Sequence, residues 1–276
     1  MIHLPAKKSL GQHFLVDSAK HKRIVDALAP QAGDVVIEIG PGTGLLTQHL
    51  LASPLNKLIA FELDARAVPE LREMFYSFGT RFEVKEQDFL EADLLGLAQN
   101  EGQKLRIVGN IPYYITSPIL FKLIDEREAL SDAHLLVQLE VAERLTAKPS
   151  TKAYGIPTVL SNFFAEVTTL FKVPRGAFRP VPNVDSAVVK IDFARDYFAR
   201  TGTPKPLDFD EAAFRKLVRG LFGMRRKTVR NNLKALISSE AMAQLETGAS
   251  ARFLTARAEE FSIADFLELA QAIHQS

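Results

Sequence analysis

The chain has 276 residues, 47% of them hydrophobic, which is enough for one large α/β domain with a small partner domain. It has no cysteine and its six histidines show no metal-ligand spacing, so disulfides, thiolate chemistry and a metal site are not expected. The net charge of +1 neither favours nor excludes a nucleic-acid partner. Because no run of about 18 apolar residues and no signal peptide is present, we expect a cytoplasmic protein without a membrane span.

The first part of the chain predicts an α/β sheet. A polar, basic arm covers residues 7–14, and Asp17 is the expected N-cap of the first helix. Short apolar strands then alternate with helices, at residues 35–39, 58–61, 82–84, 105–108 and 134–138. This alternation predicts a doubly wound, mostly parallel sheet. Two further β-like runs, 167–173 and 187–193, have no obvious helix between them and fit an antiparallel hairpin at one edge.

The sequence changes character after Asp192. Residues 201–206 read as a linker rich in Thr, Gly and Pro. Beyond the linker, apolar residues recur at helical spacing and no strand pattern is present. We therefore predict an α/β domain over residues 1–200 and a small all-helical domain over residues 201–276.

A glycine loop follows the first predicted strand. The NAD pattern G-x-G-x-x-G fails, because the third glycine position holds Leu45 or Thr47, depending on the starting glycine. The series Glu38-x-Gly40-x-Gly42-x-Gly44 instead resembles the first motif of Rossmann-like methyltransferases, whose cofactor is S-adenosylmethionine. The alternative is a plain tight turn.

Acidic residues follow the next two strands. Glu62 can accept both ribose hydroxyl protons, a role that would suit NAD equally well. Asp88 can accept a hydrogen bond from the adenine amine of the cofactor. Leu63 and Phe89 are apolar candidates to sandwich that ring. The alternative is a pair of solvated carboxylates.

The sequence Asn110-Ile111-Pro112-Tyr113 follows the fourth strand and resembles the Asn/Asp-Pro-Pro-Tyr signature of enzymes that methylate exocyclic amines. An aromatic amine is a poor nucleophile because its lone pair is delocalised into the ring. The Asn110 side-chain oxygen and the Ile111 carbonyl can accept hydrogen bonds from its two N–H groups. Pro112 restricts the preceding residue. Tyr113 can stack on the base. The alternative is a turn that merely ends the strand.

Five motifs occur together in order: residues 10–15 (LGQHFL), the glycine loop, residues 110–113, residues 152–155 (KAYG) and residues 178–186 (FRPVPNVDS). This combination resembles the ribosomal RNA adenine dimethyltransferase family. The resemblance implies dimethylation of N6 on two adjacent adenosines near the 3′ end of small-subunit (16S) rRNA, within the immature small subunit. We expect a monomeric enzyme with this role in small-subunit biogenesis.

The resemblance also implies residue roles. The family's cofactor contacts fall on the following residues: His13, Leu15, Gly40, Glu62, Asp88 and Asn110. The family often has Asn at the position of His13, so the form of that contact is open. Phe178 matches the residue expected to cover the target base opposite Tyr113; its alternative is a core phenylalanine.

Basic residues cluster in the predicted helical domain. Between residues 215 and 234 the chain carries eight Lys or Arg and no acid, which leaves the rest of the chain net negative. We predict that this segment docks on the RNA backbone through Arg225, Arg226, Lys227, Arg230 and Lys234. The alternative is a solvated helix face.

Three other functions compete with this interpretation. A large-subunit rRNA methyltransferase of the macrolide-resistance type shares the motifs, but the run 184–189 (VDSAVV) and the long helical tail favour the small-subunit enzyme. A non-catalytic RNA-binding assembly factor would not need Asn110, Tyr113 and the cofactor carboxylates. An NAD oxidoreductase is disfavoured by the glycine spacing.

Overall fold

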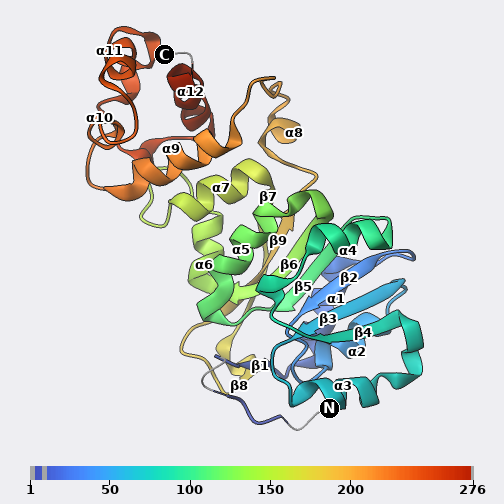
Figure 1. The fold of residues 1–276 in the computed structure, drawn as a ribbon. Coiled ribbons are helices and arrows are strands. Elements are labelled where there is room, and N and C mark those ends of the chain that lie inside the picture. The colour runs from blue at the N-terminus through green and yellow to red at the C-terminus, as the bar shows by residue number, and fades with distance from the viewer. Residues whose placement is uncertain (1–3, 8–10, 275–276) are drawn as a thin grey trace. The chain divides into compact units, whose positions relative to one another are not determined.

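The computed structural model describes residues 4–7 and 11–274 (Figure 1). The predicted arm is therefore described only at Lys7 and from Gly11 on, and His3 lies outside the described residues. Within this part of the chain, no helix has the length and apolar character needed to cross a bilayer.

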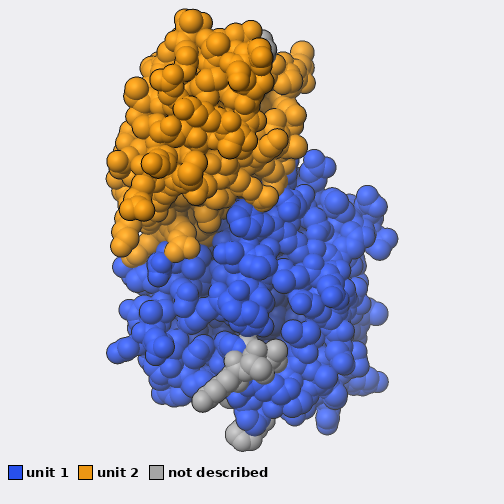
Figure 2. Space-filling view, turned by 60° about the vertical axis from the view of Figure 1, so that its left-hand side comes forward, with its two compact units in different colours: residues 1–142, 165–194 blue, residues 143–164, 195–276 orange. Residues whose placement is uncertain are grey.

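The chain forms two compact units, coloured separately in Figure 2: residues 1–142 with 165–194, and residues 143–164 with 195–276. Residues 143–164 lie inside the predicted first domain but belong to the second compact unit. The functional division near residue 200 stays a prediction.

The first unit is built on a seven-stranded sheet in the order β4-β3-β2-β5-β6-β9-β7. Its strands are β2 (Val35–Ile39), β3 (Lys57–Glu62), β4 (Phe82–Glu86), β5 (Leu105–Asn110), β6 (Leu130–Gln138), β7 (Glu166–Val173) and β9 (Ser186–Asp192). Strands β2 to β6 pair in parallel, and β9 runs antiparallel to both β6 and β7. The predicted, mostly parallel sheet with an antiparallel edge is therefore confirmed.

Helices of the first unit cover this sheet. They are α1 (Ser18–Leu28), α2 (Leu45–Leu51), α3 (Ala67–Met74), α4 (Leu94–Glu101), α5 (Thr116–Asp125) and α6 (Leu139–Leu145), with 3-10 turns η2 (Tyr76–Arg81), η3 (Phe89–Glu91), η4 (Tyr113–Ile115), η5 (Arg127–Ala129) and η6 (Arg175–Ala177). Asp17 caps α1 as predicted, because its side chain accepts from the amides of Ala19 and Lys20. Alternate strand residues such as Val36 and Leu58 pack in one hydrophobic cluster with α1, α2 and α3. All residues of β2 are buried, so both faces of the sheet are covered.

A second, two-stranded sheet pairs β1 (Phe14–Leu15) with β8 (Phe178–Arg179). Phe14 lies opposite Arg179, and Leu15 lies opposite Phe178, in antiparallel register. This small sheet joins the N-terminal arm to the proline-rich loop, two segments that are far apart in the sequence.

The second unit contains only helices among its described residues. They are α7 (Ile156–Phe164), α8 (Tyr197–Thr201), α9 (Glu211–Gly223), α10 (Val229–Leu233), α11 (Ser239–Thr247) and α12 (Ile263–His274), with 3-10 turns η7 (Ala249–Phe253) and η8 (Ala258–Glu260). Aromatic rings form much of its core, for example Phe163 and Phe214, whose centroids lie 4.2 Å apart. In the KAYG motif, the Tyr154 hydroxyl donates to the Phe261 carbonyl over 2.7 Å, so this tyrosine fastens the unit together.

Candidate active site

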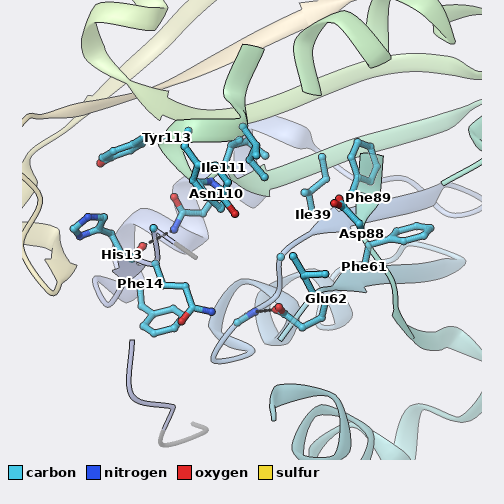
Figure 3. Close-up of a pocket in the computed structure, with 18 of the residues that line it drawn as sticks. His13, Phe14, Ile39, Phe61, Glu62, Asp88, Phe89, Asn110, Ile111 and Tyr113 are labelled. Carbon is cyan, nitrogen blue, oxygen red and sulfur yellow. Dashed lines mark hydrogen bonds between the residues drawn. The ribbon is translucent and has the colours of Figure 1, made fainter. Parts of the chain in front are cut away.

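A pocket lies at the carboxyl edge of the parallel strands, where ligands bind in open α/β sheets (Figure 3). The segments after β2, β3, β4 and β5 line it together with the arm. Predicted site residues on its wall are His13, Gly40, Glu62, Leu63, Asp88, Phe89, Asn110, Ile111, Pro112 and Tyr113. Leu15 and Phe178 do not line this pocket.

Glu62 is held in place by the glycine loop. One of its carboxylate oxygens accepts from the Gly42 amide over 2.9 Å, and the other accepts from the Asp64 amide over 2.8 Å. Burial raises the pKa of Glu62, and these backbone hydrogen bonds oppose the shift. Gly42 has a φ of 52°, and a Cβ there would lie 2.9 Å from the Phe14 ring, so glycine is required. Each Glu62 oxygen can accept more than one hydrogen bond, which leaves capacity for a ligand.

Strand β4 leads to Asp88 and Phe89, which lie on the same wall. One Asp88 oxygen accepts from the Leu90 amide over 2.9 Å and starts the turn η3. Phe89 is buried and meets Phe61 edge to face, with centroids 5.8 Å apart. The Leu63 side chain lines the pocket and is 52% exposed, so it offers apolar surface to a ligand. Acceptor and apolar surface together fit a purine ring.

A smaller cavity shares Phe14, Gly40 and Asn110 with the pocket and is lined in addition by Leu15 and Glu38. Glu38 is almost fully buried and accepts from the Thr47 hydroxyl over 2.7 Å. Desolvation raises the pKa of Glu38 to about 8, against the lowering effect of that hydrogen bond. Glu38 is therefore mostly protonated at neutral pH.

Asn110 ends β5 with its side-chain amide oriented. The Asn110 Nδ2 donates to the His13 carbonyl over 2.9 Å, as Figure 3 shows. Because the donor end is occupied, the Oδ1 atom is the group left to accept from a ligand. The adjacent Ile111 amide donates to the Leu136 carbonyl over 3.1 Å, which ties this peptide to β6. Pro112 follows with φ −55° and ψ 133° and directs the chain into η4.

Tyr113 and His13 form a ring pair at the pocket. Their centroids lie 5.6 Å apart and their planes differ by 21°. The Tyr113 hydroxyl is 3.1 Å from the Ser186 hydroxyl on β9. Burial raises the pKa of Tyr113, so it stays a neutral phenol at physiological pH. The His13 Nδ1 lies 2.8 Å from the Pro180 carbonyl oxygen in the proline-rich loop.

Phe178 lies elsewhere. Its side chain is fully buried in the hydrophobic cluster of the sheet, and Leu15 faces it across the β1–β8 pair. A ring without an exposed face cannot stack on a base while it stays in the core. In this structure Phe178 is a core residue, and its expected role as the cover of a target base stays a prediction.

Several residues on the wall were not singled out by the sequence patterns. Gln12, Phe14, Ile39, Phe61, Gln87 and Ile115 line the pocket. Ile39 and Phe61 are the last apolar residues of their strands, so position at a strand end was the available signal. Gln12 and Lys7 reach Asp64, at 3.3 Å and 3.2 Å, and Arg66 pairs with the same carboxylate. Asp64 thereby anchors the arm beside Glu62.

The predicted RNA-docking residues lie in the loop before α10, on α10 and, for Lys234, directly after it. Two of them are paired with acids that are distant in sequence: Arg225 contacts Glu259 at 2.7 Å, and Arg230 contacts Glu246 at 2.6 Å. Arg226, Lys227 and Lys234 are exposed, and no ion pair of theirs is found within the described part of the chain. The free positive charge is thus smaller than the sequence indicates.

A family model described as "Ribosomal RNA adenine dimethylase" matches residues 4–275. The chain is 42% identical over 266 residues to a protein of Xanthomonas axonopodis pv. citri described as ribosomal RNA small subunit methyltransferase A, covering 96% of this chain and 95% of that one. It is 45% identical over 229 residues to a protein of the same description from Salinibacter ruber, covering 83% of this chain and 73% of that one.

Solved structures of known transferases have the same fold as this chain. A dimethyladenosine transferase from Plasmodium falciparum matches with a TM-score of 0.77 and 26% identity, covering 95% of this chain and 98% of that one. The 23S rRNA methyltransferase ErmE matches with a TM-score of 0.64 and 28% identity, covering 95% of this chain and all of that one. The fold is therefore that of the S-adenosylmethionine-dependent methyltransferases, as predicted.

Proposed function

This chain belongs to the ribosomal RNA adenine dimethylase family, and on that premise we propose that it dimethylates N6 of two adjacent adenosines near the 3′ end of 16S rRNA. The relatives at 40–45% identity described as small-subunit methyltransferases favour 16S rRNA over the large-subunit substrate of ErmE. The observation that carries the chemistry is the Asn110 side chain, whose donor end is bound to His13 and whose oxygen is left to accept.

S-adenosylmethionine fits the acceptors and the apolar surface at the carboxyl edge of the sheet. Glu62 is a buried carboxylate fixed by two backbone amides, a geometry suited to the ribose hydroxyls. Asp88 beside Phe89 and Leu63 offers an acceptor and apolar surface for the adenine. Once bound, the cofactor supplies a methyl group activated by its sulfonium.

The protein's own contribution is to orient the accepting amine. Asn110 Oδ1 and the Ile111 carbonyl accept hydrogen bonds from the two N–H groups of the amine. This favours a pyramidal nitrogen with its lone pair free for the methyl. The Asn110 side chain is oriented before substrate arrives by its hydrogen bond to the His13 carbonyl. The Ile111 amide donates a hydrogen bond to the Leu136 carbonyl, and Pro112 restricts the peptide that carries the Ile111 carbonyl. Preorganised acceptors cost no rearrangement during the reaction. The amine becomes acidic as it is alkylated, so a strong general base is not needed.

RNA docking is assigned to the second unit. Of the five predicted docking residues, Arg226, Lys227 and Lys234 are exposed without an acid partner in the described part of the chain, and they suit contacts to phosphates. Such contacts position the RNA, and base chemistry is left to the first unit.

Methyl incorporation tests the assignment. The purified protein is incubated with radiolabelled S-adenosylmethionine and either immature small subunits or large subunits. We expect label in 16S rRNA alone. Label in 23S rRNA would indicate the resistance-type enzyme, and RNA binding without any label would indicate an assembly factor.

A further inference from the structure

We propose that the loop between α6 and α7 (residues 146–155) and the loop between α9 and α10 (residues 224–228) form one site for the phosphate backbone of RNA. In this site Lys148 and Lys152 contact phosphates beside Arg226 and Lys227, and Arg225 ties the two loops together. Both loops belong to the second compact unit. The inference rests on the proposed function, because it extends the surface that docks on RNA to a loop that carries the KAYG motif.

An ion pair and two hydrogen bonds join the two loops. Arg225 Nε donates to the Glu259 carboxylate over 2.7 Å, and Arg225 Nη2 donates to the Thr151 carbonyl over 3.2 Å. The backbone carbonyl of Glu259 accepts from the Ser150 amide over 2.7 Å. Arg225 and Glu259 thereby hold the middle of the first loop against the second. Because its guanidinium is engaged in this way, Arg225 is a positioning residue for the phosphate site and not one of its contacts.

Loop 146–155 is held in a conformation that its sequence alone does not favour. Ser150 has a φ of 64°, in the left-handed region that residues other than glycine adopt rarely. The Thr151 hydroxyl donates to the Lys148 carbonyl over 2.7 Å, which keeps the backbone of Lys148 next to the residue that precedes Lys152. The hydrogen bond of the Tyr154 hydroxyl fixes the end of the loop. Strained backbone of this kind is concentrated at functional sites, and here it sets the positions of two lysines.

Loop 224–228 is also fixed by its own backbone. The Lys227 amide donates to the Met224 carbonyl over 2.8 Å, which closes a tight turn. Arg225 and Arg226 are the two central residues of this turn. Arg225 contacts the first loop, whereas the Arg226 and Lys227 side chains are exposed. Both loops therefore present their cations from an ordered backbone, so less conformational entropy is lost when RNA binds.

The charge of the two loops suits a polyanion. Neither loop contains Asp or Glu. Four of their side chains are exposed and take part in no ion pair within residues 4–7 and 11–274, namely Lys148, Lys152, Arg226 and Lys227. The adjoining turn η8 contributes Glu259, which Arg225 neutralises, and Glu260, so positive charge remains in excess. Cations on two joined loops match the regular spacing of phosphates along an RNA strand, and such contacts position the RNA without reading its bases.

The test measures binding of the full chain to immature small subunits across a KCl series, without cofactor, so that no methyl transfer takes place. The variant is Lys148→Gln with Lys152→Gln. The matched control, Lys104→Gln with Lys205→Gln, removes the same charge from two other exposed lysines. Lys205 lies over the Phe209 ring before α9, and the 13 residues of that helix put about 20 Å between its start and loop 224–228. Lys104 precedes β5 in the first unit.

Each phosphate that is no longer neutralised lowers the log–log salt slope of binding by about 0.7–0.9. We expect the variant with both loop lysines changed to lose up to about 1.4–1.8 from that slope, with cofactor Kd, measured by calorimetry, within about twofold of the parent. The control pair should keep the parental slope. A parental slope for the loop variant would overturn the proposal. Equal flattening by the control pair would also overturn it, because net charge alone would then explain the loss.

Glu259→Ala tests how the loops are held together. By Coulomb attraction alone, removal of an acid beside phosphate-binding cations tightens RNA binding. We expect weaker binding and a smaller salt slope instead, because loop 146–155 loses its tie to Arg225. When Lys148 and Lys152 are already Gln, Glu259→Ala should cause no further loss, since it acts through them.

Tighter binding of Glu259→Ala, or the same loss in both backgrounds, would show that the ion pair does not position the lysines. Failure of the proposed function is a separate result, namely the absence of methyl transfer to small subunits by the parent protein.

Discussion

At the scale of single residues, Asn110 is the group whose removal should affect chemistry most. Asn110→Ala deletes an acceptor that the structure has oriented before the substrate binds. By analogy with the removal of an oxyanion-hole donor, we expect kcat to fall by about 10²–10³. RNA affinity should stay near the parent value, because the contact strengthens only as the amine pyramidalises.

Asn110→Asp separates the two ends of that side chain. It keeps an acceptor but replaces the donor to the His13 carbonyl with a second oxygen, which repels it. We expect a turnover between those of the parent and the alanine variant in single-turnover kinetics. A parental rate for both variants would show that the loop is not the catalytic element.

Glu38 gives a pH dependence of stability. Burial raises its pKa from 4.5 to about 8, so the folded chain holds a proton that the unfolded chain has released between these values. Glu38 therefore makes stability fall as pH rises through that window, by up to about 1.4 kcal/mol per pH unit. Glu38→Gln should remove this slope. Urea unfolding from pH 5 to 8 measures it, with exposed Glu70→Gln as control; equal slopes in parent and Glu38→Gln would contradict the assignment.

Most of the pocket could be predicted from the sequence because its residues follow strand ends. Glu62 and Asn110 end β3 and β5, and Asp88 comes two residues after the end of β4. Parallel strands bring such positions together. The position of Phe178 could not be predicted in this way. A phenylalanine in a motif reads the same whether its ring faces a ligand or the core, and only the β1–β8 pairing decides.

At the scale of elements, the arm is attached beside Glu62 through Asp64. The Asp64 side chain has no exposed surface, and hydrogen bonds from Arg66, with Lys7 and Gln12, hold the pKa of its carboxyl well below its usual range. The arm residues 11–14 in turn line the pocket. The Asp64 carboxylate therefore holds the arm, while its backbone amide holds Glu62.

Asp64→Asn should loosen the arm. Losing hydrogen bonds between charged groups costs about 1–3 kcal/mol, part of it screened because Lys7 and Arg66 are partly exposed. We expect faster amide exchange at residues 11–15 and a larger Kd for the cofactor. Asp26→Asn, which removes an exposed ion pair with Lys22, is the control. Unchanged exchange in the arm would mean that Asp64 does not anchor it.

The order of the elements was easier to predict than their pairing. Alternating strands and helices indicate a parallel sheet, but the insertion of β9 between β6 and β7 depends on contacts distant in sequence. The two-residue strands β1 and β8 are too short to show any periodicity. Their pairing follows from tertiary structure alone.

At the scale of the whole molecule, the structure narrows the basic surface expected to meet RNA. Pairing of Arg225 with Glu259 and of Arg230 with Glu246 leaves Arg226, Lys227 and Lys234 as the cations to neutralise. The triple Gln variant should flatten the log–log salt dependence of RNA binding by up to about 0.7–0.9 for each phosphate that it no longer neutralises. Cofactor affinity should not change.

The matched control for that surface is Arg252→Gln. Arg252 is exposed in the same unit and is paired with Glu268 at 2.6 Å. RNA affinity measured across a salt series distinguishes the two variants. Superimposable slopes for the parent and the triple variant would place the RNA elsewhere.

If the pocket methylates the exocyclic amine of adenine, the chemical identity of the product shows it. Immature small subunits are incubated with the protein and S-adenosylmethionine carrying a deuterated methyl, and the 16S rRNA is digested to nucleosides for mass spectrometry. We expect label in N6,N6-dimethyladenosine at two adjacent positions near the 3′ end, and none with Asn110→Ala on the same timescale. Label on a ribose oxygen, on a ring carbon or on any base other than adenine would contradict it.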